Sequence, residues 1–282
     1  MNAPWLPLFC DAPLARRIEH AEVDLIRALN LAGRSRSPKG FLIPCAGGVA
    51  SFAADGSPYN KVTGLGFDGV PEPEELDLIE HAFAARNAPT QVELAHLADP
   101  AIGELFTGRG YRLESFENIL GRSLDDLEPA MPADGIDIRR SPDDEFDEWL
   151  AVMTDSVAHP DTDGLPWHEE FPRAIYEEAM RDGARAGVRR YAARRDGSLA
   201  GGAELRVVDG IAQFAGAATA PDHRRHGVQN ALLSVRLADA AAEGCDLAVI
   251  VTQPGSKSHQ NAQRRGFHLL YTRAVLVKTA AS

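Results

Sequence analysis

Cysteine, basic residues and long apolar runs are scarce in this sequence, and each scarcity excludes a class of protein. The three cysteines, Cys10, Cys45 and Cys245, form no CxxC pair and no Cys/His ligand spacing. We therefore expect a reduced, cytoplasmic protein without a zinc site. The longest apolar run, residues 247–251, is far shorter than the roughly 20 residues of a membrane-spanning helix. The amino terminus has no basic region followed by an apolar core, so neither a signal peptide nor a membrane partner is expected.

Positive charge is also in the minority. The chain has 29 Lys and Arg against 41 Asp and Glu, a formal net charge of -12, and no long basic run. Nucleic acid is therefore not expected as a partner, because its phosphate backbone needs a basic stripe. With 282 residues, of which 44% are hydrophobic, the chain can bury a sizeable core and exceeds the usual length of one domain. Two domains are the first expectation.

A linker-like segment and a weak repeat both divide the chain near its middle. Residues 125–136 (DDLEPAMPADGI) are acidic and contain two prolines and a glycine, which predicts a first domain of residues 1–131 and a second of residues 132–282. The repeat has a period of about 155 residues. Its clearest blocks are an apolar run and a later glycine-aromatic pair, Gln91 to Ala95 with Gly110-Tyr111 and Leu247 to Thr252 with Gly266-Phe267.

Hydrophobic periodicity predicts a mixed α/β (α+β) fold class, with a central mixed sheet, a strand meander and flanking helices in each half. The second half begins with a strand over 136–140 and helices over 142–157 and 171–183. Strands joined by Asp-Gly turns follow, and then a helix, a strand, a short helix and a closing strand: 188–194, 199–207, 211–219, 228–243, 247–252, 258–265 and 267–278. The first half shows fainter helices over 14–32 and 74–86 and strands over 49–53, 60–65 and 91–95.

The segment Thr219 to Leu233 (TAPDHRRHGVQNALL) places two arginines, a histidine and a glycine between a predicted strand and helix. The first amides of a helix have no intrahelical acceptor and carry the positive end of its dipole, so this loop can bind a phosphate. Gly227 allows close approach, and Arg224 or Arg225 can add a charge-assisted contact. A solvated cap is the alternative. The matching loop of the first half, 68–74, is acidic with two prolines and would repel a phosphate.

The run Arg224-Arg225-His226-Gly227-Val228-Gln229 resembles the Arg/Gln-x-x-Gly-x-Gly/Ala signature of the GNAT (N-acetyltransferase) superfamily, with Gln229 where a small residue is usual. The resemblance covers about residues 136–278 and, more faintly, 41–120. It implies a tandem GNAT protein whose first copy is degenerate and has lost its CoA loop. Two fused copies would imitate a GNAT homodimer, which favours a monomer.

This resemblance implies acetyl-CoA as cosubstrate, with its pyrophosphate at the loop and its pantetheine arm beside strand 211–219. The implied cofactor-binding residues are Ala217, Ala218, Thr219, Arg224, Arg225, His226, Gly227, Val228, Gln229, Asn230, Ser258 and Asn261. Simpler explanations exist for some of them, since small residues in a strand also pack against helices and Ser258 and Asn261 can lie on a solvated helix face. Ser256 is better explained as a helix N-cap.

The expected catalytic residues are Glu204 and Tyr271. Glu204 is the one acidic residue within the central meander and could take a proton from an amine, although an outward-facing glutamate is the alternative. Where the family often has a tyrosine acid, this sequence has Ala262. Tyr271 could replace it if it faces the cleft, and otherwise water would protonate the thiolate; a core position is the alternative for Tyr271.

The predicted function is transfer of an acyl group, most simply acetyl, from CoA to a small-molecule or peptide amine by direct attack. A non-catalytic acyl-CoA-binding protein is the rival, and a structural α/β pair without CoA is a third hypothesis. His159, Asp161 and His168 resemble a metal cluster, but loop residues of these types are usually solvated, so no metal is expected.

Overall fold

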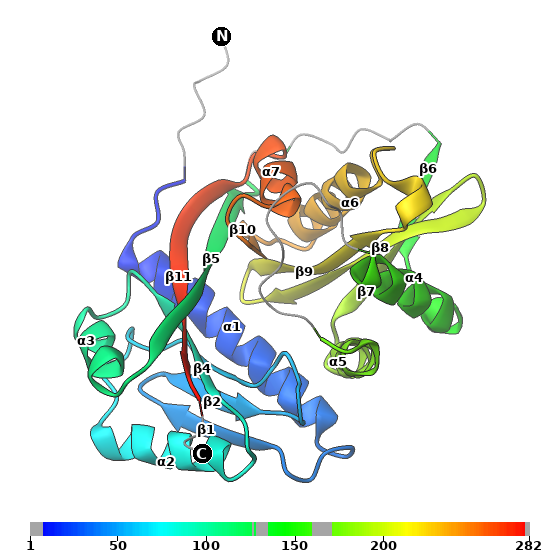
Figure 1. The fold of residues 1–282 in the computed structure, drawn as a ribbon. Helices are drawn as coiled ribbons and strands as arrows, with labels where there is room; N and C mark the ends of the chain where they lie inside the picture. The colour runs from blue at the N-terminus through cyan, green and yellow to red at the C-terminus, as the bar shows by residue number, and fades with distance from the viewer. Residues whose placement is uncertain (1–7, 126, 128–134, 160–170, 280–282) are drawn as a thin grey trace.

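The computed structural model describes residues 8–125, 127, 135–159 and 171–279. A single sheet of 11 strands runs through both halves of the chain, with helices on both of its faces (Figure 1). Its strand order is β1-β2-β3-β4-β11-β5-β10-β9-β8-β7-β6. The mixed α/β class predicted from the sequence is confirmed. None of the described helices is both long and apolar enough to cross a membrane.

The elements of the first half follow the predicted pattern and add three that periodicity missed, β1, α3 and β5. They are α1 (Ala12–Gly33), β1 (Phe41–Cys45), β2 (Gly48–Phe52), β3 (Lys61–Thr63), α2 (Pro73–Ala84), β4 (Thr90–Ala95), α3 (Ala101–Gly108) and β5 (Arg112–Ser123).

The second half matches its predicted elements closely. Its elements are β6 (Ile136–Arg140), the 3-10 turn η1 (Asp143–Glu145), α4 (Phe146–Ala158), α5 (Arg173–Arg185), β7 (Arg189–Arg195), β8 (Ser198–Val208), β9 (Ile211–Thr219), the 3-10 turn η2 (Pro221–His223), α6 (Val228–Ala242), β10 (Leu247–Thr252), α7 (Lys257–Arg264) and β11 (His268–Lys278). The Asp-Gly dipeptides at 196–197 and 209–210 all have positive φ, which is why they close the tight hairpins of the meander.

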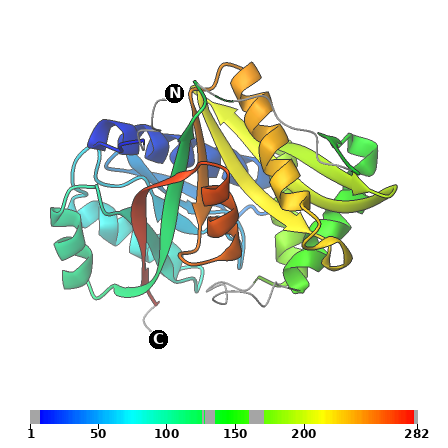
Figure 2. The ribbon, with the colours of Figure 1, turned by 90° about the horizontal axis from the view of Figure 1, so that it is seen from above.

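The closing strand of each half lies against the other half. β5 ends the first half but pairs antiparallel with β10, while β11 ends the second half and lies between β4 and β5. These two long strands run side by side at the centre of the molecule (Figure 2). The halves therefore share their central strands. The predicted division near residue 132 falls among residues that the structure does not describe.

Two helical layers cover the sheet. On one face α6 packs Leu232, Leu233 and Leu237 against β8, β9 and β10. On the opposite face α1 packs against β5, β10 and β11, and α4 and α5 continue that layer. Alternating side chains of β10 divide between the faces, since Ala248 and Ile250 contact the α6 layer and Leu247 and Val249 the α1 layer.

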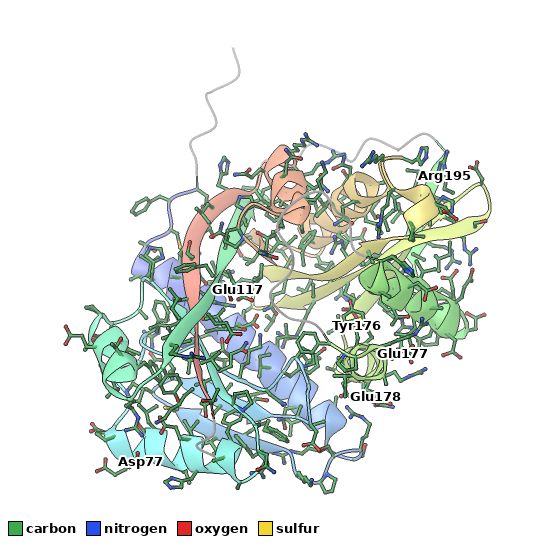
Figure 3. All side chains as sticks on the ribbon, in the orientation of Figure 1. Asp77, Glu117, Tyr176, Glu177, Glu178 and Arg195 are labelled. Carbon is green, nitrogen blue, oxygen red and sulfur yellow. The ribbon has the colours of Figure 1, made fainter. Side chains whose placement is uncertain are left out.

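A buried group of charges holds β11 in the first half. The Arg273 guanidinium Nε lies 2.8 Å from Glu19 of α1, and its Nη1 lies 3.4 Å from Glu93 of β4 and 3.7 Å from Glu117 of β5. Glu117 is labelled in Figure 3. Lys61 of β3 pairs with Glu93 as the second cation. Arg273 belongs to the second half and its three carboxylates to the first, so this group joins the halves.

Candidate active site of the second half

The loop between β9 and α6 leaves the start of α6 open. Gly227 is the N-cap of α6 with φ of 86° and ψ of 0°, a left-handed conformation that a residue with a side chain rarely adopts. A Cβ there would meet only the Ile136 side chain, at 3.9 Å, so backbone conformation rather than space requires glycine. Within the described part of the chain no side chain caps α6, and its first turn, Val228, Gln229 and Asn230, contains no acidic residue. The free amides suit an anion.

The first arginine of this loop points to α4, and the second has a left-handed backbone conformation. Arg224 donates from its guanidinium to the backbone carbonyls of Ser156, at 3.3 Å, and of His159, at the carboxyl end of α4. A cation is favourable there because it meets the negative end of the helix dipole. Arg225 has φ of 65°, so two positive-φ residues shape the turn on either side of His226. The Arg224 side chain thus points to α4.

Beside this loop the sheet opens along β9. Its parallel pairing with β10 covers only Ile211 to Phe214, opposite Leu247 to Ile250, whereas its pairing with β8 continues to Thr219. Ala217, Ala218 and Thr219 therefore lie where β9 has no ladder with β10. A bulge precedes them, because Ala203 pairs with Ala217 but Glu204 with Ala215, and the extra residue is Gly216. This unpaired edge offers backbone groups to an amide-containing ligand.

α7 completes the group of predicted cofactor residues. It packs against α6 and β10, which brings Ser258 and Asn261 to the same end of the second half as the loop. Ser258 is exposed and Asn261 half-buried. The prediction for Ser256 is confirmed, since its hydroxyl accepts the His259 amide at 3.1 Å as the N-cap of α7.

Glu204 is buried on β8, so the alternative of an outward-facing surface glutamate is wrong. Its side chain is 4% exposed, and its Oε1 has no hydrogen-bond partner among the described residues. The carboxylate lies beside two glycines: a Cβ at Gly183 of α5 would be 3.5 Å from Oε1, and one at Gly216 would be 2.8 Å from Oε2. Burial raises the pKa of Glu204 to about 7, against the opposing pull of Arg190 and Arg236. Near neutral pH this group can accept a proton.

Arg236 of α6 is a site residue that sequence reasoning missed. It is fully buried and donates from Nη1 to the backbone carbonyls of Glu204, at 2.8 Å, and of Ala215, at 3.4 Å, with its guanidinium 4.6 Å from the Phe214 ring centroid. Burial lowers the pKa of Arg236 to about 9. Because both carbonyls flank the bulge, Arg236 holds the opening of the sheet. A lone arginine one turn after Leu232, within an apolar helix face, was the available signal.

Tyr271 is not at this opening. It lies on β11, two strands from β10, and its hydroxyl donates to Glu19 of α1 at 2.7 Å. Burial and the Glu19 charge raise the pKa of Tyr271 well above its usual value. The expectation that Tyr271 acts as the acid is therefore corrected: its hydroxyl serves the buried charge group. Ala262, at the position where the family often has its tyrosine, is fully buried among core side chains such as Phe267. This position therefore offers no hydroxyl that could act as the acid.

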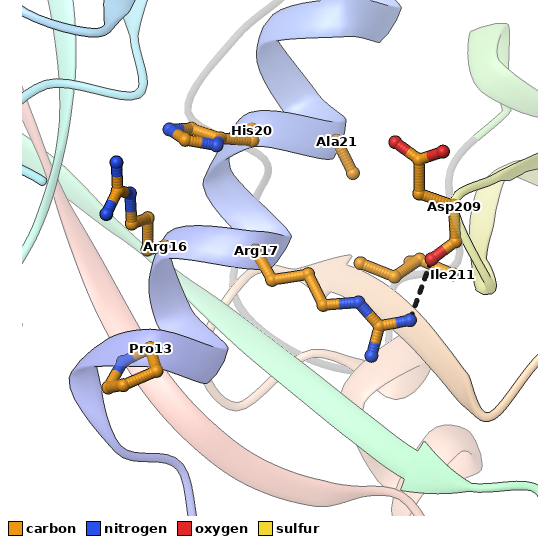
Figure 4. A pocket seen from close by; sticks show the side chains of 7 residues that line it. All are labelled: Pro13, Arg16, Arg17, His20, Ala21, Asp209 and Ile211. Carbon is orange, nitrogen blue, oxygen red and sulfur yellow. Dashed lines mark hydrogen bonds between the residues drawn. The ribbon is translucent and has the colours of Figure 1, made fainter. Parts of the chain in front are cut away.

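The suggested metal cluster is described only in part, and a cavity lies elsewhere in the molecule. His159 follows α4 and is exposed, whereas Asp161 and His168 of the suggested metal cluster lie outside the described residues. The described residues contain no group of His, Cys, Asp or Glu that could hold a metal. A cavity of about 250 Å³ lies at the opposite end of β9, between α1 and the β8–β9 turn (Figure 4). Arg17 crosses it to the backbone oxygen of Asp209, at 2.7 Å, and to Asp246.

The first half has the corresponding loop in a closed form. Asp68 is paired with Arg16 and, at 2.9 Å, with His20 of α1. At the start of α2 the Glu75 carboxylate accepts the backbone amide of Glu72 at 2.9 Å, and Pro73 supplies no amide. An incoming phosphate would meet carboxylates where α6 presents free amides.

Comparisons with known proteins agree with this geometry. Residues 147–267 match the model of the acetyltransferase (GNAT) family. The fold is similar to a GCN5-related N-acetyltransferase from Kribbella flavida, with 21% identity over 92% of this chain and 96% of that one and a TM-score of 0.62. It is also similar to a tandem GNAT protein from the clavulanic acid biosynthesis pathway, with 15% identity over 90% and 88% of the chains and a TM-score of 0.60. No curated protein matches the sequence.

The match to the GNAT acetyltransferase family thus lies within the second half of the chain. The chain as a whole has the fold of tandem GNAT proteins.

Proposed function

We propose that the second half transfers an acyl group, most simply acetyl, from acetyl-CoA to a small-molecule or peptide amine. The observation that carries this proposal is the position of Glu204. A buried carboxylate whose Oε1 has no hydrogen-bond partner in the described chain lies next to the bulge that opens β9. The same strand leads directly into the anion-binding start of α6.

Each part of the site has a role in this reaction. The amides of Gly227 to Asn230 hold the pyrophosphate, and the unpaired edge from Ala217 to Thr219 binds the amides of the pantetheine arm. Glu204 removes a proton from the attacking amine, directly or through water. A backbone amide near Ala217 or Ala218 stabilises the oxyanion formed when the C–N bond forms. The C–S bond then breaks, and water supplies the proton that the thiolate takes up, since Tyr271 is engaged elsewhere.

The experiment is a panel of primary amines with acetyl-CoA, measuring thiol release and the mass of the acylated product. Wild-type protein is expected to turn over, and Glu204→Gln is expected to lower kcat by about 10² to 10³-fold with unchanged CoA affinity, as for loss of a general base. The wild-type kcat should rise with pH through about 7, because Glu204 acts only when ionised. CoA binding without thiol release for any amine would instead establish the non-catalytic alternative.

A further inference from the structure

Glu204 faces one stripe of α5. Tyr176, Ala179 and Gly183 are spaced at about one helical turn and so lie on the same face of that helix. Gly183 packs against the Glu204 carboxylate, because a Cβ added at this glycine would lie 3.5 Å from Oε1. Tyr176, labelled in Figure 3, lies about two turns earlier on that face. Burial and, after it, the charge of Glu204 raise the pKa of the Tyr176 hydroxyl.

A loop of the first half reaches the same face. The β2–β3 connection is fixed by Asn60, whose side chain accepts the Ala53 amide at 2.8 Å and donates to the Ala54 carbonyl at 2.7 Å. From this loop the Tyr59 hydroxyl donates to the Ala179 carbonyl of α5 at 3.1 Å. Besides burial, the Glu204 charge is the leading cause that raises the pKa of Tyr59.

The first half also holds α5 in place. Arg36, just after α1, pairs with the buried carboxylate of Asp182 and, at 2.7 Å, with Glu178. α1 and α5 lie side by side, as Figure 1 shows. The helix that covers Glu204 is therefore positioned by contacts from the other half of the chain.

Glu204 has no fixed cation as a side-chain partner in the described structure. Arg190, opposite it on β7, donates to Asp143 at 2.6 Å and stacks 4.5 Å from the Phe146 ring centroid. Arg236 bonds to backbone carbonyls. An ammonium group would complement the carboxylate, and phenol faces suit both a cation and methylene groups. The 4% exposure of Glu204 leaves a narrow approach.

We propose that Tyr59 of the first half and Tyr176 of the second form walls of the acceptor site beside Glu204, and that they select a primary amine on a slim, apolar arm. This inference rests on the proposed function. It assigns the degenerate half a role: its β2–β3 loop determines which acceptor the second half acylates.

The test compares butylamine, benzylamine and 1-naphthylmethylamine as acceptors for wild type, Tyr59→Ala and Gly183→Ala. Removing the Tyr59 ring should raise kcat/KM for the two aromatic amines relative to butylamine by about 10-fold. Gly183→Ala puts a methyl group against Glu204 in a helix that tolerates alanine. It should lower kcat/KM about 10-fold for every amine without lowering Tm or CoA affinity. Gly103→Ala in α3, where a Cβ meets nothing within 4 Å, is the matched control and should equal wild type.

The outcomes separate the two proposals. Wild type that releases no thiol with any amine overturns the proposed function, and this inference with it. Active wild type with the same amine ranking in Tyr59→Ala and the same kcat/KM in Gly183→Ala overturns this inference alone. If Tyr59→Ala does not fold, Gly183→Ala and Tyr59→Trp decide: the larger ring must disfavour the aromatic amines further, and an unchanged ranking contradicts the proposal.

Discussion

The two halves of the chain share a fold but differ at the start of one corresponding helix. In the second half, α6 begins at Gly227 with free amides and no acidic residue in its first turn. In the first half, α2 begins among Glu72, Pro73 and Glu75, and Asp68 before it is already paired with α1. A shared backbone plan therefore does not imply a shared ligand, because the local donors and charges decide what binds.

The first half nevertheless contributes to the second through shared strands and through α5. Its β5 pairs with β10, and its Tyr59 and Arg36 contact α5, which covers Glu204. The halves differ in role: one carries the open helix start and the buried carboxylate, and the other positions elements around them.

The largest effect is expected where the halves join. Arg273→Met removes the cation that Glu19, Glu93 and Glu117 share, so buried carboxylates lose the positive charge that compensates them. The free energy of unfolding should therefore fall by about 3 to 5 kcal/mol. Urea denaturation measures this change. Arg112→Met, at an exposed position on β5, is the control and should change stability by less than about 0.5 kcal/mol. Equal effects of both substitutions would show that the charge group does not hold β11.

The contrast between the helix starts is sharpened by a pair of glycine substitutions. Gly227→Asp adds a carboxylate and a disfavoured conformation at the start of α6 and should weaken CoA binding by about 10² to 10³-fold. Gly69→Asp makes the same change in the first-half loop, also at positive φ, and should leave the affinity unchanged. Calorimetric titration measures both. Wild-type affinity in Gly227→Asp would place the CoA site elsewhere.

Stability should improve when the buried carboxyl is neutralised. The pKa of Glu204 is raised from 4.5 to about 7 by burial, so the folded state binds its proton more tightly than the unfolded state. The stabilisation that comes from protonated Glu204 is fully present below pH 4.5 and is lost as the pH rises through about 7. At pH 8, Glu204→Gln should therefore be more stable than wild type by up to about 3 kcal/mol, and at pH 4 equal to it.

Chemical denaturation at both pH values measures this difference. Glu104→Gln, at an exposed position on α3, is the control and should show no pH-dependent gain. A Glu204→Gln variant that is less stable than wild type at pH 8 would mean that the carboxylate has a favourable partner.

The smallest effect is expected at Arg224. Its guanidinium bonds to carbonyls at the end of α4, so Arg224→Ala should lower the free energy of unfolding by about 1 kcal/mol without CoA. Because the side chain points to α4, the CoA dissociation constant should rise less than about 10-fold. Titration and thermal denaturation measure the two effects. A rise above about 100-fold would show that Arg224 turns to the phosphates when CoA binds.

The sequence predicts the individual helices and strands well. It does not predict that the closing strand of each half pairs with a strand of the other half. Hydrophobic periodicity, the Asp-Gly turns and the Gly227 loop predict β7 to β11, α6 and α7, because each of these signals depends on residues close together in the sequence. Whether β5 or β11 lies beside β10 depends on contacts between residues far apart in the chain.

The candidate site shows the same limit. The loop before α6 was found from its residues, but strand alternation left Glu204 and Tyr271 an even chance of facing either way. In the structure both side chains are buried, but the Glu204 carboxylate faces α5 and the Tyr271 hydroxyl faces Glu19 of α1. Tyr59 could not be found from the sequence, because its partner Ala179 belongs to the other half.

Calorimetric titration of the whole chain with CoA tests the central claim most directly. Because the amides are free at the start of α6 and blocked by carboxylates at the start of α2, we predict one site per chain. Gly227→Asp should weaken it by about 10² to 10³-fold, and Gly69→Asp should leave it unchanged. Two equivalent sites would contradict the claimed difference between the halves, and no binding at all would contradict the CoA site itself.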